Sequence, residues 1–185
     1  MKGVALLTGK HTALRPPVEA DLPFLVTLRN NLRLQMLLMA QPRANSLPRV
    51  REWVARIGGD ERSLFFIVAA RPRARPLGYI QLTHLDPVHG TAELGICLAE
   101  AAQGRGHGRE ALSLLENYAR DVFNLRKIVL RVFAEHAPAA AFYRKAGYKK
   151  VGVHQQHFYQ SGAYHDVLVM EKFLRVPGHR GRRTG

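Results

Sequence analysis

Apolar and polar residues along the chain alternate with a period of two in some segments and recur about every 3.6 residues in others, which are the spacings of strands and of helices. Period-two runs predict strands over residues 10–15, 64–70, 77–83, 91–98, 127–133, 148–157 and 164–173. Helical spacing predicts helices over residues 19–30, 48–57, 109–122 and 138–146. Strands first in a meander, then alternating with helices, then in a hairpin predict an α/β (α+β) fold with a mixed sheet.

Length and composition predict the domain organisation. A chain of 185 residues with 46% apolar and 23% charged residues is predicted to form one domain, over residues 1–175. The last segment, Val176–Gly185, has no apolar periodicity and is rich in arginine, so a disordered basic tail is predicted. The single cysteine excludes an internal disulfide, and no apolar run approaches the roughly 20 residues of a membrane-spanning helix. We therefore expect a cytoplasmic protein without a membrane partner.

The net charge narrows the choice of partners. Lysine and arginine number 28 against 14 acidic residues, so the formal net charge is +14. Such a field attracts nucleic acid, phosphates or an anionic cofactor, and it disfavours a polycationic substrate such as a polyamine. A solvated arginine-rich surface without a partner accounts for the charge equally well.

A glycine-rich segment, Gln103–Arg109, lies between the strand predicted over 91–98 and the helix predicted over 109–122. Glycines at such a turn let backbone N–H groups approach a ligand, and the helix N-terminus adds unpaired donors and partial positive charge. With Arg105 and Arg109, the segment predicts a pyrophosphate-binding site. No Gly-Lys-Ser/Thr follows, so the segment is not a Walker loop. A flexible surface turn is the alternative.

Within this segment, Gln103-Gly104-Arg105-Gly106-His107-Gly108 resembles the Gln/Arg-x-x-Gly-x-Gly/Ala motif of the Gcn5-related N-acetyltransferases (GNAT), which binds the pyrophosphate of acetyl-CoA. Residues 92–96 are similar to the family's strand that lies beside the thioester. Residues 141–148 are similar to its Tyr-x-Lys-x-Gly-Phe segment. Residues 162–171 are similar to the C-terminal segment of the ribosomal-protein N-terminal acetyltransferase branch. Arg29-Asn30 is similar to the Trp-Arg-Asn of that branch and of amino-sugar-nucleotide acetyltransferases. The resemblance spans residues 10–174.

This resemblance implies a GNAT-like domain whose mostly antiparallel sheet has about seven strands, with a splay between the central strands. It implies acetyl-CoA as cosubstrate and no metal. The implied cofactor-binding residues are Ile96, Cys97, Leu98, Gln103, Gly104, Arg105, Gly106, His107, Gly108, Arg109, His136 and Tyr143. His136 stands where the family usually has an asparagine that contacts the pantetheine arm, and imidazole can also donate one hydrogen bond. Leu28 stands where the branch often has tryptophan.

Acetyl transfer to an amine needs a general base and a general acid, because an alkylamine has a pKa of about 10.4 and the leaving thiolate needs a proton. Glu93 is the candidate base, since alternation places it on one face of the thioester strand with Gly95 and Cys97. A surface salt bridge is the alternative role for Glu93, and Glu135 is the reserve base. Tyr143 matches the family's general acid, with core packing as its alternative role.

Cys97 is predicted to be a small buried thiol rather than a nucleophile, because no histidine is paired with it in the sequence. The resemblance implies that a backbone N–H near Ile96 or Cys97 stabilises the oxyanion, so we expect direct attack in a ternary complex. His154 and His157 lie three residues apart on a predicted strand, on opposite faces, which argues against a metal pair.

The function indicated is acetyl-CoA-dependent N-acetylation of a primary amine, either on a small molecule, on a nucleotide-linked amino sugar or at a protein N-terminus. A non-catalytic acetyl-CoA-binding sensor is the main alternative. A basic nucleic-acid-binding module is a weaker one, because no aromatic residues interleave with the arginines of residues 71–75. A homodimer formed through the terminal β-hairpin is a further expectation.

Overall fold

The computed structural model describes residues 5–175, so the tail predicted over residues 176–185 lies outside the described range. One sheet holds eight strands in the order β1-β2-β3-β4-β5-β6-β8-β7. The strands are β1 (Leu7–Thr8), β2 (Thr12–Arg15), β3 (Leu64–Ala70), β4 (Arg75–Asp86), β5 (Thr91–Leu98), β6 (Lys127–Phe133), β7 (Lys149–Gln160) and β8 (Ala163–Phe173). β5 and β6 are parallel and the other neighbours are antiparallel. The predicted mixed, mostly antiparallel sheet is confirmed, with the two-residue β1 as an additional strand.

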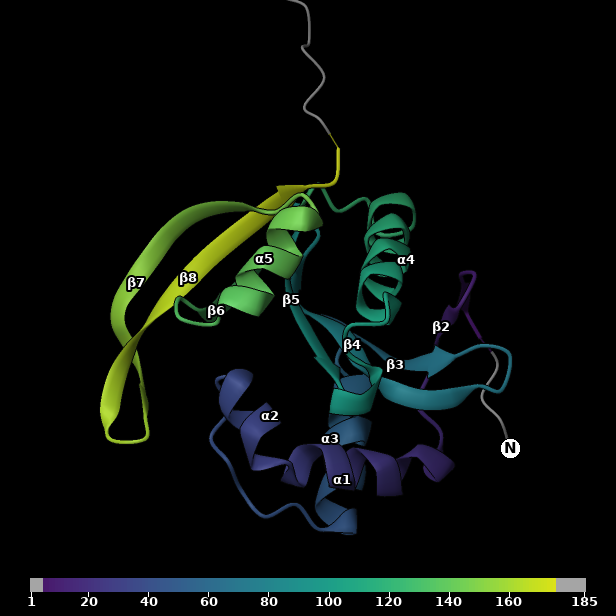
Figure 1. Ribbon diagram of the computed structural model, residues 1–185. Helices are drawn as coiled ribbons and strands as arrows, with labels where there is room; N and C mark the ends of the chain where they lie inside the picture. The colour runs from purple at the N-terminus through teal and green to yellow at the C-terminus, as the bar shows by residue number, and fades with distance from the viewer. Residues whose placement is uncertain (1–4, 176–185) are drawn as a thin grey trace, which may run out of the picture.

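Helices cover both faces of this sheet (Figure 1). One layer contains the 3-10 helix η1 (Glu19–Asp21), α1 (Leu22–Asn30), α2 (Leu32–Leu37) and α3 (Leu47–Gly58), and the other contains α4 (His107–Asp121) and α5 (Ala137–Lys145). A short 3-10 helix, η2 (Glu100–Ala102), precedes the glycine-rich segment. Alternation along the strands gives each face its own apolar core: Ile80 belongs to the core under α4 and α5, and Ile67 to the core under α1 and α3. No helix in the described range is long and apolar enough to cross a bilayer.

The hydrophobic pattern predicts the central strands well and one helix not at all. The strands predicted over residues 64–70, 91–98 and 127–133 have those bounds in the structure. The missing helix is α2, which follows α1 after the single residue Asn31. The Asn31 side chain caps α2 by accepting a hydrogen bond from the backbone N–H of Leu34 at 3.1 Å. A helix of six residues is too short to show a helical repeat in the sequence.

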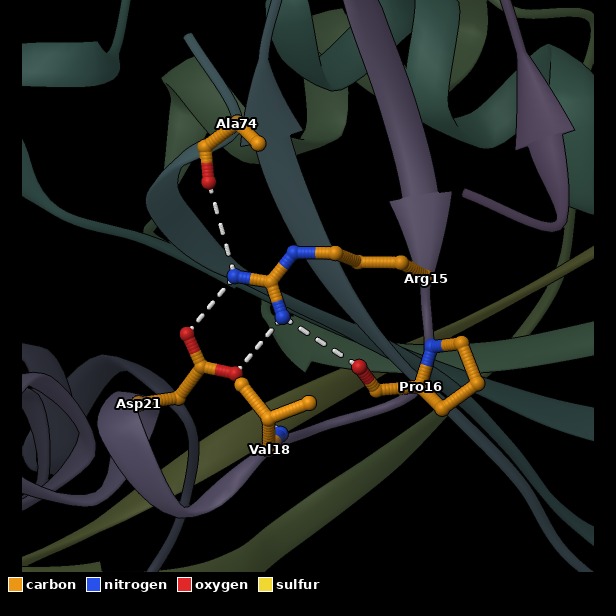
Figure 2. Close-up of polar contacts among 5 residues, drawn as sticks. All are labelled: Arg15, Pro16, Val18, Asp21 and Ala74. Atoms are coloured by element: carbon orange, nitrogen blue, oxygen red, sulfur yellow. Dashed lines mark hydrogen bonds and ion pairs between the residues drawn. The ribbon is translucent and has the colours of Figure 1, made fainter. Parts of the chain in front are cut away.

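A buried ion pair joins β2 to the first helical layer (Figure 2). The Arg15 guanidinium donates two hydrogen bonds to the Asp21 carboxylate, at 2.6 and 2.7 Å, and a third to the carbonyl of Pro16 at 3.2 Å. Asp21 also accepts from the backbone N–H of Val18 at 2.9 Å. The Arg15 and Asp21 side chains are only 4% and 3% exposed. Each charge therefore depends on the other, and the pair sets the start of α1 against the sheet.

The central strands separate part of the way along their length. β5 pairs with β6 only from Thr91 to Glu93, opposite Lys127 to Val129. Beyond this point β5 continues to pair with β4, and β6 continues to pair with β8. Figure 1 shows the β6–β8–β7 part of the sheet turning away from the β2–β5 part. This is the splay expected between the central strands.

The β7–β8 hairpin extends beyond the end of β6 (Figure 1). Two aromatic side chains near its turn are exposed. Tyr159 and Tyr164 are 60% and 65% exposed, and their rings lie 5.1 Å apart between centroids. A homodimer formed through this hairpin stays a prediction.

Candidate active site

A cleft of about 750 Å³ opens where β5 and β6 separate. It is lined from both helical layers, by Arg29 and Leu34 on one side and by Pro138 on the other. The predicted site residues in its wall are Glu93, Ile96, Cys97, Leu98, Gln103, His136 and Tyr143. The other predicted residues, 104–109, follow Gln103 directly and lie outside the wall of this cleft.

Strand β5 presents alternate residues to the two helical layers. Cys97 packs in the core under α1 and α3, whereas Ile96 packs against the core under α4 and α5. By alternation, Glu93 and Gly95 share the face of Cys97. Tyr143 belongs to the core under α4 and α5. The candidate base and the candidate acid therefore reach the cleft from opposite faces of the sheet.

The glycine-rich segment has the backbone conformation that its sequence predicts. Gly104 and Gly106 have φ values of 72° and 83°, in the left-handed region that favours glycine. A Cβ at either position would meet no atom within 4 Å, so the space beside both glycines is open. Gly106 is the N-cap of α4, and no side chain of residues 5–175 caps this helix. The first N–H groups of α4 thus have no helical partner, which suits the oxygens of a pyrophosphate.

Gly108 and the side chain of His107 allow α4 to pack closely against the sheet. A Cβ on Gly108 would lie 3.3 Å from Leu98 Cδ1 and 3.6 Å from the Phe142 ring, so glycine allows α4 to lie close to β5 and α5. The Nδ1 atom of His107 lies 2.9 Å from Oγ1 of Thr12, so this side chain contacts β2. The backbone of these two residues, rather than their side chains, is available to a ligand.

The polar side chains of the same segment fall into two kinds. Gln103 Nε2 donates to the carbonyl of Leu98 at 3.0 Å, which ties the turn to the end of β5. Arg105 and Arg109 are exposed, and within the described chain neither forms an ion pair. Their charges are therefore available to an anion at the turn.

Glu93 occupies the last position at which β5 pairs with β6, and its carboxylate contacts Arg131 and lies near His84. Arg131 Nε donates to Glu93 Oε1 at 2.8 Å, and His84 Nδ1 lies 3.7 Å from Oε2. The Glu93 side chain is 29% exposed, so its carboxylate keeps contact with solvent. The salt bridge considered as an alternative is present, and it orients the carboxylate without removing it from water.

Tyr143 reaches the cleft from α5 and is buried. Burial raises the pKa of its phenol well above the ordinary value. The phenol therefore keeps its proton at neutral pH, as a proton donor must. The Tyr143 ring also packs edge-on against Phe142, with centroids 5.0 Å apart, so a packing role accompanies any chemical one.

His136 and Glu135 stand next to each other in sequence but differ in their relation to the cleft. His136 lines it, at the N-cap of α5. Burial lowers the pKa of His136, so its ring is neutral near pH 7 and offers one donor and one acceptor. Glu135, the reserve base, is 73% exposed, contacts His165 at 3.2 Å and does not line the cleft.

Cysteine and histidine side chains near the cleft do not indicate other chemistry. Cys97 is 4% exposed, and burial raises the pKa of its thiol to about 12, so the predicted buried thiol is present. The expectation that His154 and His157 lie on opposite faces is wrong: their rings stack, with centroids 4.8 Å apart. The register shift between His154 and Phe158 interrupts the alternation. Within residues 5–175, no cluster of three metal-binding side chains forms.

Three residues of the cleft wall, Arg29, Trp53 and Arg131, were not predicted as site residues. The Arg29 guanidinium carbon lies 4.2 Å from the centroid of the Trp53 ring. The Arg29-Asn30 pair was the one sequence signal that pointed to Arg29. Trp53 and Arg131 belong to no local motif, and they join the site only through packing.

The sequence matches the acetyltransferase (GNAT) domain family over residues 11–149. Spermidine N(1)-acetyltransferase of Vibrio cholerae serotype O1 is 27% identical over 170 residues, covering 90% of this chain and 97% of the relative. The L-amino acid N-acetyltransferase AaaT of Escherichia coli K12 is 29% identical over 139 residues, covering 72% of this chain and 75% of the relative. The crystal structure of the Vibrio cholerae spermidine N-acetyltransferase in complex with CoA and spermine has a TM-score of 0.82 at 26% identity, over 88% of this chain and 95% of that chain.

A splayed sheet between two helical layers, with an uncapped glycine turn beside the splay, defines an acyl-CoA-dependent transferase. The chain belongs to the GNAT acetyltransferase family. It is an acetyl-CoA-dependent N-acetyltransferase, and the predicted enzyme class is confirmed.

Proposed function

We propose that this acetyltransferase transfers the acetyl group of acetyl-CoA to a primary amine of a small molecule, by direct attack within a ternary complex. One observation carries the proposal: pairing between β5 and β6 ends at Glu93 and Val129, and Glu93 and Tyr143 line the resulting cleft. Because these two side chains lie on opposite faces of the sheet, the acceptor and the cosubstrate can meet from opposite sides.

Acetyl-CoA supplies an activated acetyl group in the form of a thioester. Gly104, Gly106 and the first turn of α4 would hold its pyrophosphate, and Arg105 and Arg109 would add charge. The open space beside both glycines and the uncapped helix support this assignment. His136 would donate a hydrogen bond to the pantetheine arm in place of the family's asparagine.

Glu93 would take the proton of the acceptor ammonium, directly or through one water. An alkylamine with a pKa of about 10.4 arrives protonated at neutral pH and cannot attack until it loses that proton. Arg131 occupies Oε1 of Glu93, and Oε2, with His84 Nδ1 3.7 Å away, would serve for the transfer. General base catalysis of this kind contributes about 10²–10⁴ in rate.

The nitrogen lone pair then forms the new N–C bond while the C–S bond breaks. β6 offers no ladder partner to β5 beyond Glu93, and a backbone N–H near Ile96 or Cys97 would meet the negative charge on the carbonyl oxygen. Tyr143 would give its proton to the departing thiolate, and the second proton, which the nitrogen loses as the amide forms, would return to the Tyr143 phenolate through solvent. The buried Cys97 thiol, with its raised pKa, supports direct attack over a covalent acetyl-enzyme.

The two relatives described above support a small-molecule acceptor. One is named for spermidine and another for L-amino acids, and both substrates are small amines. The cleft volume of about 750 Å³ is also in the range of pockets that bind small ligands.

Acetyl transfer is tested by following thiol release from acetyl-CoA in the presence of primary amines, with mass spectrometry of the products. We expect amine-dependent thiol release, an equal amount of N-acetylated amine, and intersecting double-reciprocal plots. Parallel plots with an acetylated protein would contradict direct attack. Thiol release without an acetylated amine would contradict the proposed function.

A further inference from the structure

Arg29, in the last turn of α1, lines the cleft in a fixed orientation. Its guanidinium stacks on Trp53, and its Nε donates to Oδ1 of Asn45 at 3.3 Å. Asn45 is 6% exposed, and its side-chain amide donates to the carbonyls of Arg29 and Arg43 at 3.0 and 2.6 Å. Within the described chain, the two terminal nitrogens of Arg29 have no hydrogen-bond acceptor. A guanidinium in this state is ready to bind a ligand without further ordering.

The charge of Arg29 has no counter-charge in residues 5–175. The other arginines of the cleft wall have acidic neighbours: Arg131 pairs with Glu93 at 2.8 Å, and Arg33 lies 3.8 Å from Glu100. No carboxylate of the described chain forms an ion pair with Arg29. The acidic residues of the cleft thus neutralise two of its arginines, and the charge of Arg29 stays without a counter-charge.

Arg29 is also partly withdrawn from water. Burial lowers the pKa of its guanidinium, and the nearby cations Arg49 and Arg56 act in the same direction. Arginine nevertheless stays protonated in proteins. A half-buried cation among like charges is unfavourable in the free protein, and an anion supplied by a ligand would remove that cost.

Arg29 lies on the acceptor side of the sheet. Tyr79 and Cys97, the neighbours that affect its ionisation, belong to the core under α1 and α3. This is the face of Glu93, whereas Tyr143 and the glycine-rich segment belong to the α4–α5 side. An anion at Arg29 would therefore be part of the acceptor rather than the pyrophosphate of acetyl-CoA.

We propose that the acceptor is a primary amine that also carries a carboxylate or a phosphate, and that Arg29 binds this anionic group. The inference rests on the proposed function, since it names the substrate class of the same cleft. The two terminal nitrogens of a guanidinium match two oxygens of a carboxylate or a phosphate. A polyamine has no such group, and it would bring further positive charge beside Arg29.

The test compares amines that differ in their second functional group. L-Leucine carries a carboxylate beside the amine and γ-aminobutyrate carries one at its far end. Aminopropyl phosphate carries a phosphate, aminobutanol carries a neutral hydroxyl, and spermidine carries further ammonium groups. Acetyl transfer to each is measured for the wild type, Arg29→Gln, Arg29→Lys and Arg56→Gln. Acetyl-CoA affinity and the melting temperature are measured for the same proteins.

For the wild type, we expect kcat/KM for at least one anionic amine to exceed that for aminobutanol by about 10- to 100-fold, as charge-assisted hydrogen bonds provide. Carboxylate and phosphate probes show which anion is preferred. Arg29→Gln should lower kcat/KM for the anionic amines to about that for aminobutanol, mainly by raising KM. Arg29→Lys should keep part of the preference. Arg56→Gln also removes one positive charge, but from an exposed position on α3 outside the cleft wall. This control variant should keep the full preference for anionic amines.

If spermidine or aminobutanol is acetylated with a kcat/KM as high as that of every anionic amine, the assignment of Arg29 is overturned, although acetyl transfer is established. An anion preference that survives Arg29→Gln would overturn it as well. Retained acetyl-CoA affinity shows that a loss in Arg29→Gln is not misfolding. If acetyl-CoA binds and none of these amines is acetylated, the proposed function fails together with the acceptor assignment, and the binding measurement identifies that case.

Discussion

The two sides of the cleft are assembled in different ways. On the side proposed to hold acetyl-CoA, the cofactor side, one contiguous segment, 103–109, forms the glycine turn and the start of α4. On the side proposed to hold the amine, the acceptor side, Glu93, Arg131, Arg29 and Trp53 come from β5, β6, α1 and α3. A ligand shared across the family can be bound by a contiguous motif, because local backbone conformation suffices for it. An acceptor is bound by side chains that only packing brings together, so it can differ between members.

The candidate acid and base also lie in different environments. Tyr143 is 8% exposed, and burial holds its proton. Glu93 is 29% exposed and forms a salt bridge with Arg131, so its carboxylate keeps contact with solvent. The two candidate proton-transfer groups thus differ in their contact with water before any ligand binds.

The largest effect should come from removing the hydroxyl on the cofactor side. Tyr143→Phe should lower kcat by about 10²–10⁴, because the thiolate loses its proton donor, while acetyl-CoA affinity stays nearly unchanged. Steady-state kinetics and calorimetric binding measure the two quantities. Tyr148→Phe is the matched control, since Tyr148 is 2% exposed and lies outside the cleft wall. Equal losses of kcat in both variants would show a general packing effect instead.

Loss of the buried ion pair should weaken the acceptor side of the fold selectively. Asp21→Asn leaves Arg15 buried without a counter-charge and should cost about 3–5 kcal/mol of unfolding free energy, a fall in Tm of at least about 6 °C. Below the transition, acetyl-CoA affinity should be unchanged, because α4 and α5 are not touched. Glu19→Gln, which breaks the exposed pair with Arg51, should leave Tm unchanged. A parallel loss of acetyl-CoA affinity in Asp21→Asn would show that the two sides are coupled.

A side chain in the glycine turn should separate binding from stability. Gly106→Val should reduce acetyl-CoA affinity by about 100-fold or more, because the added carbons occupy the space of the pyrophosphate and its hydrogen bonds are lost. Gly162→Val in the β7–β8 turn is the matched control, since both glycines have open space beside them and φ values of 83° and 87°. Both variants should lose about 1–2 kcal/mol of stability from the left-handed conformation. Equal affinity for acetyl-CoA in the two variants would remove Gly106 from the binding site.

On the acceptor side, Glu93→Gln should lower kcat near pH 7 by about 100-fold. Glutamine can still accept a hydrogen bond from Arg131 but cannot take a proton. The deficit should shrink as pH rises toward the acceptor's own pKa of about 10, where the amine loses its proton to solvent. Tyr143 does not limit this rise, because its pKa is raised. Glu135→Gln, outside the cleft, should behave as the wild type, and a deficit in Glu93→Gln that is constant with pH would exclude a role as base.

The smallest effect should come from restoring the family's residue at the N-cap of α5. His136→Asn should change the KM for acetyl-CoA by no more than about threefold, because both side chains can donate one hydrogen bond. Burial lowers the pKa of His136, so the folded protein binds its proton less readily than the unfolded chain does. The wild type should therefore lose stability relative to His136→Asn as pH falls below about 6.5. Thermal melting across this pH range measures the difference, and a gap that is independent of pH would contradict it.

The elements that sequence analysis predicted best are those with long, uniform patterns. The strand over 91–98 and the helix that follows Gly106 are specified by apolar periodicity and by glycine chemistry, both local properties. The stacking of His154 on His157 could not be predicted, because a register shift in β7 interrupts the alternation on which the prediction depended. Helix α2 was not predicted, because six residues are too few to show a helical repeat in the sequence.

The sequence by itself determined the family, the two-sided alternation of β5 and the glycine turn, because each depends on residues that are neighbours along the chain. Tertiary structure alone decided where β5 and β6 part, which carboxylate meets which arginine, and which charge is left over. Those outcomes depend on the pairing of β5 with β4 and of β6 with β8, which continues where β5 and β6 separate, and on contacts between residues far apart in sequence. Arg29 shows the division clearly: its motif is visible in the sequence, but the lack of a counter-charge among the described residues appears only when α1, α3 and β5 pack around it.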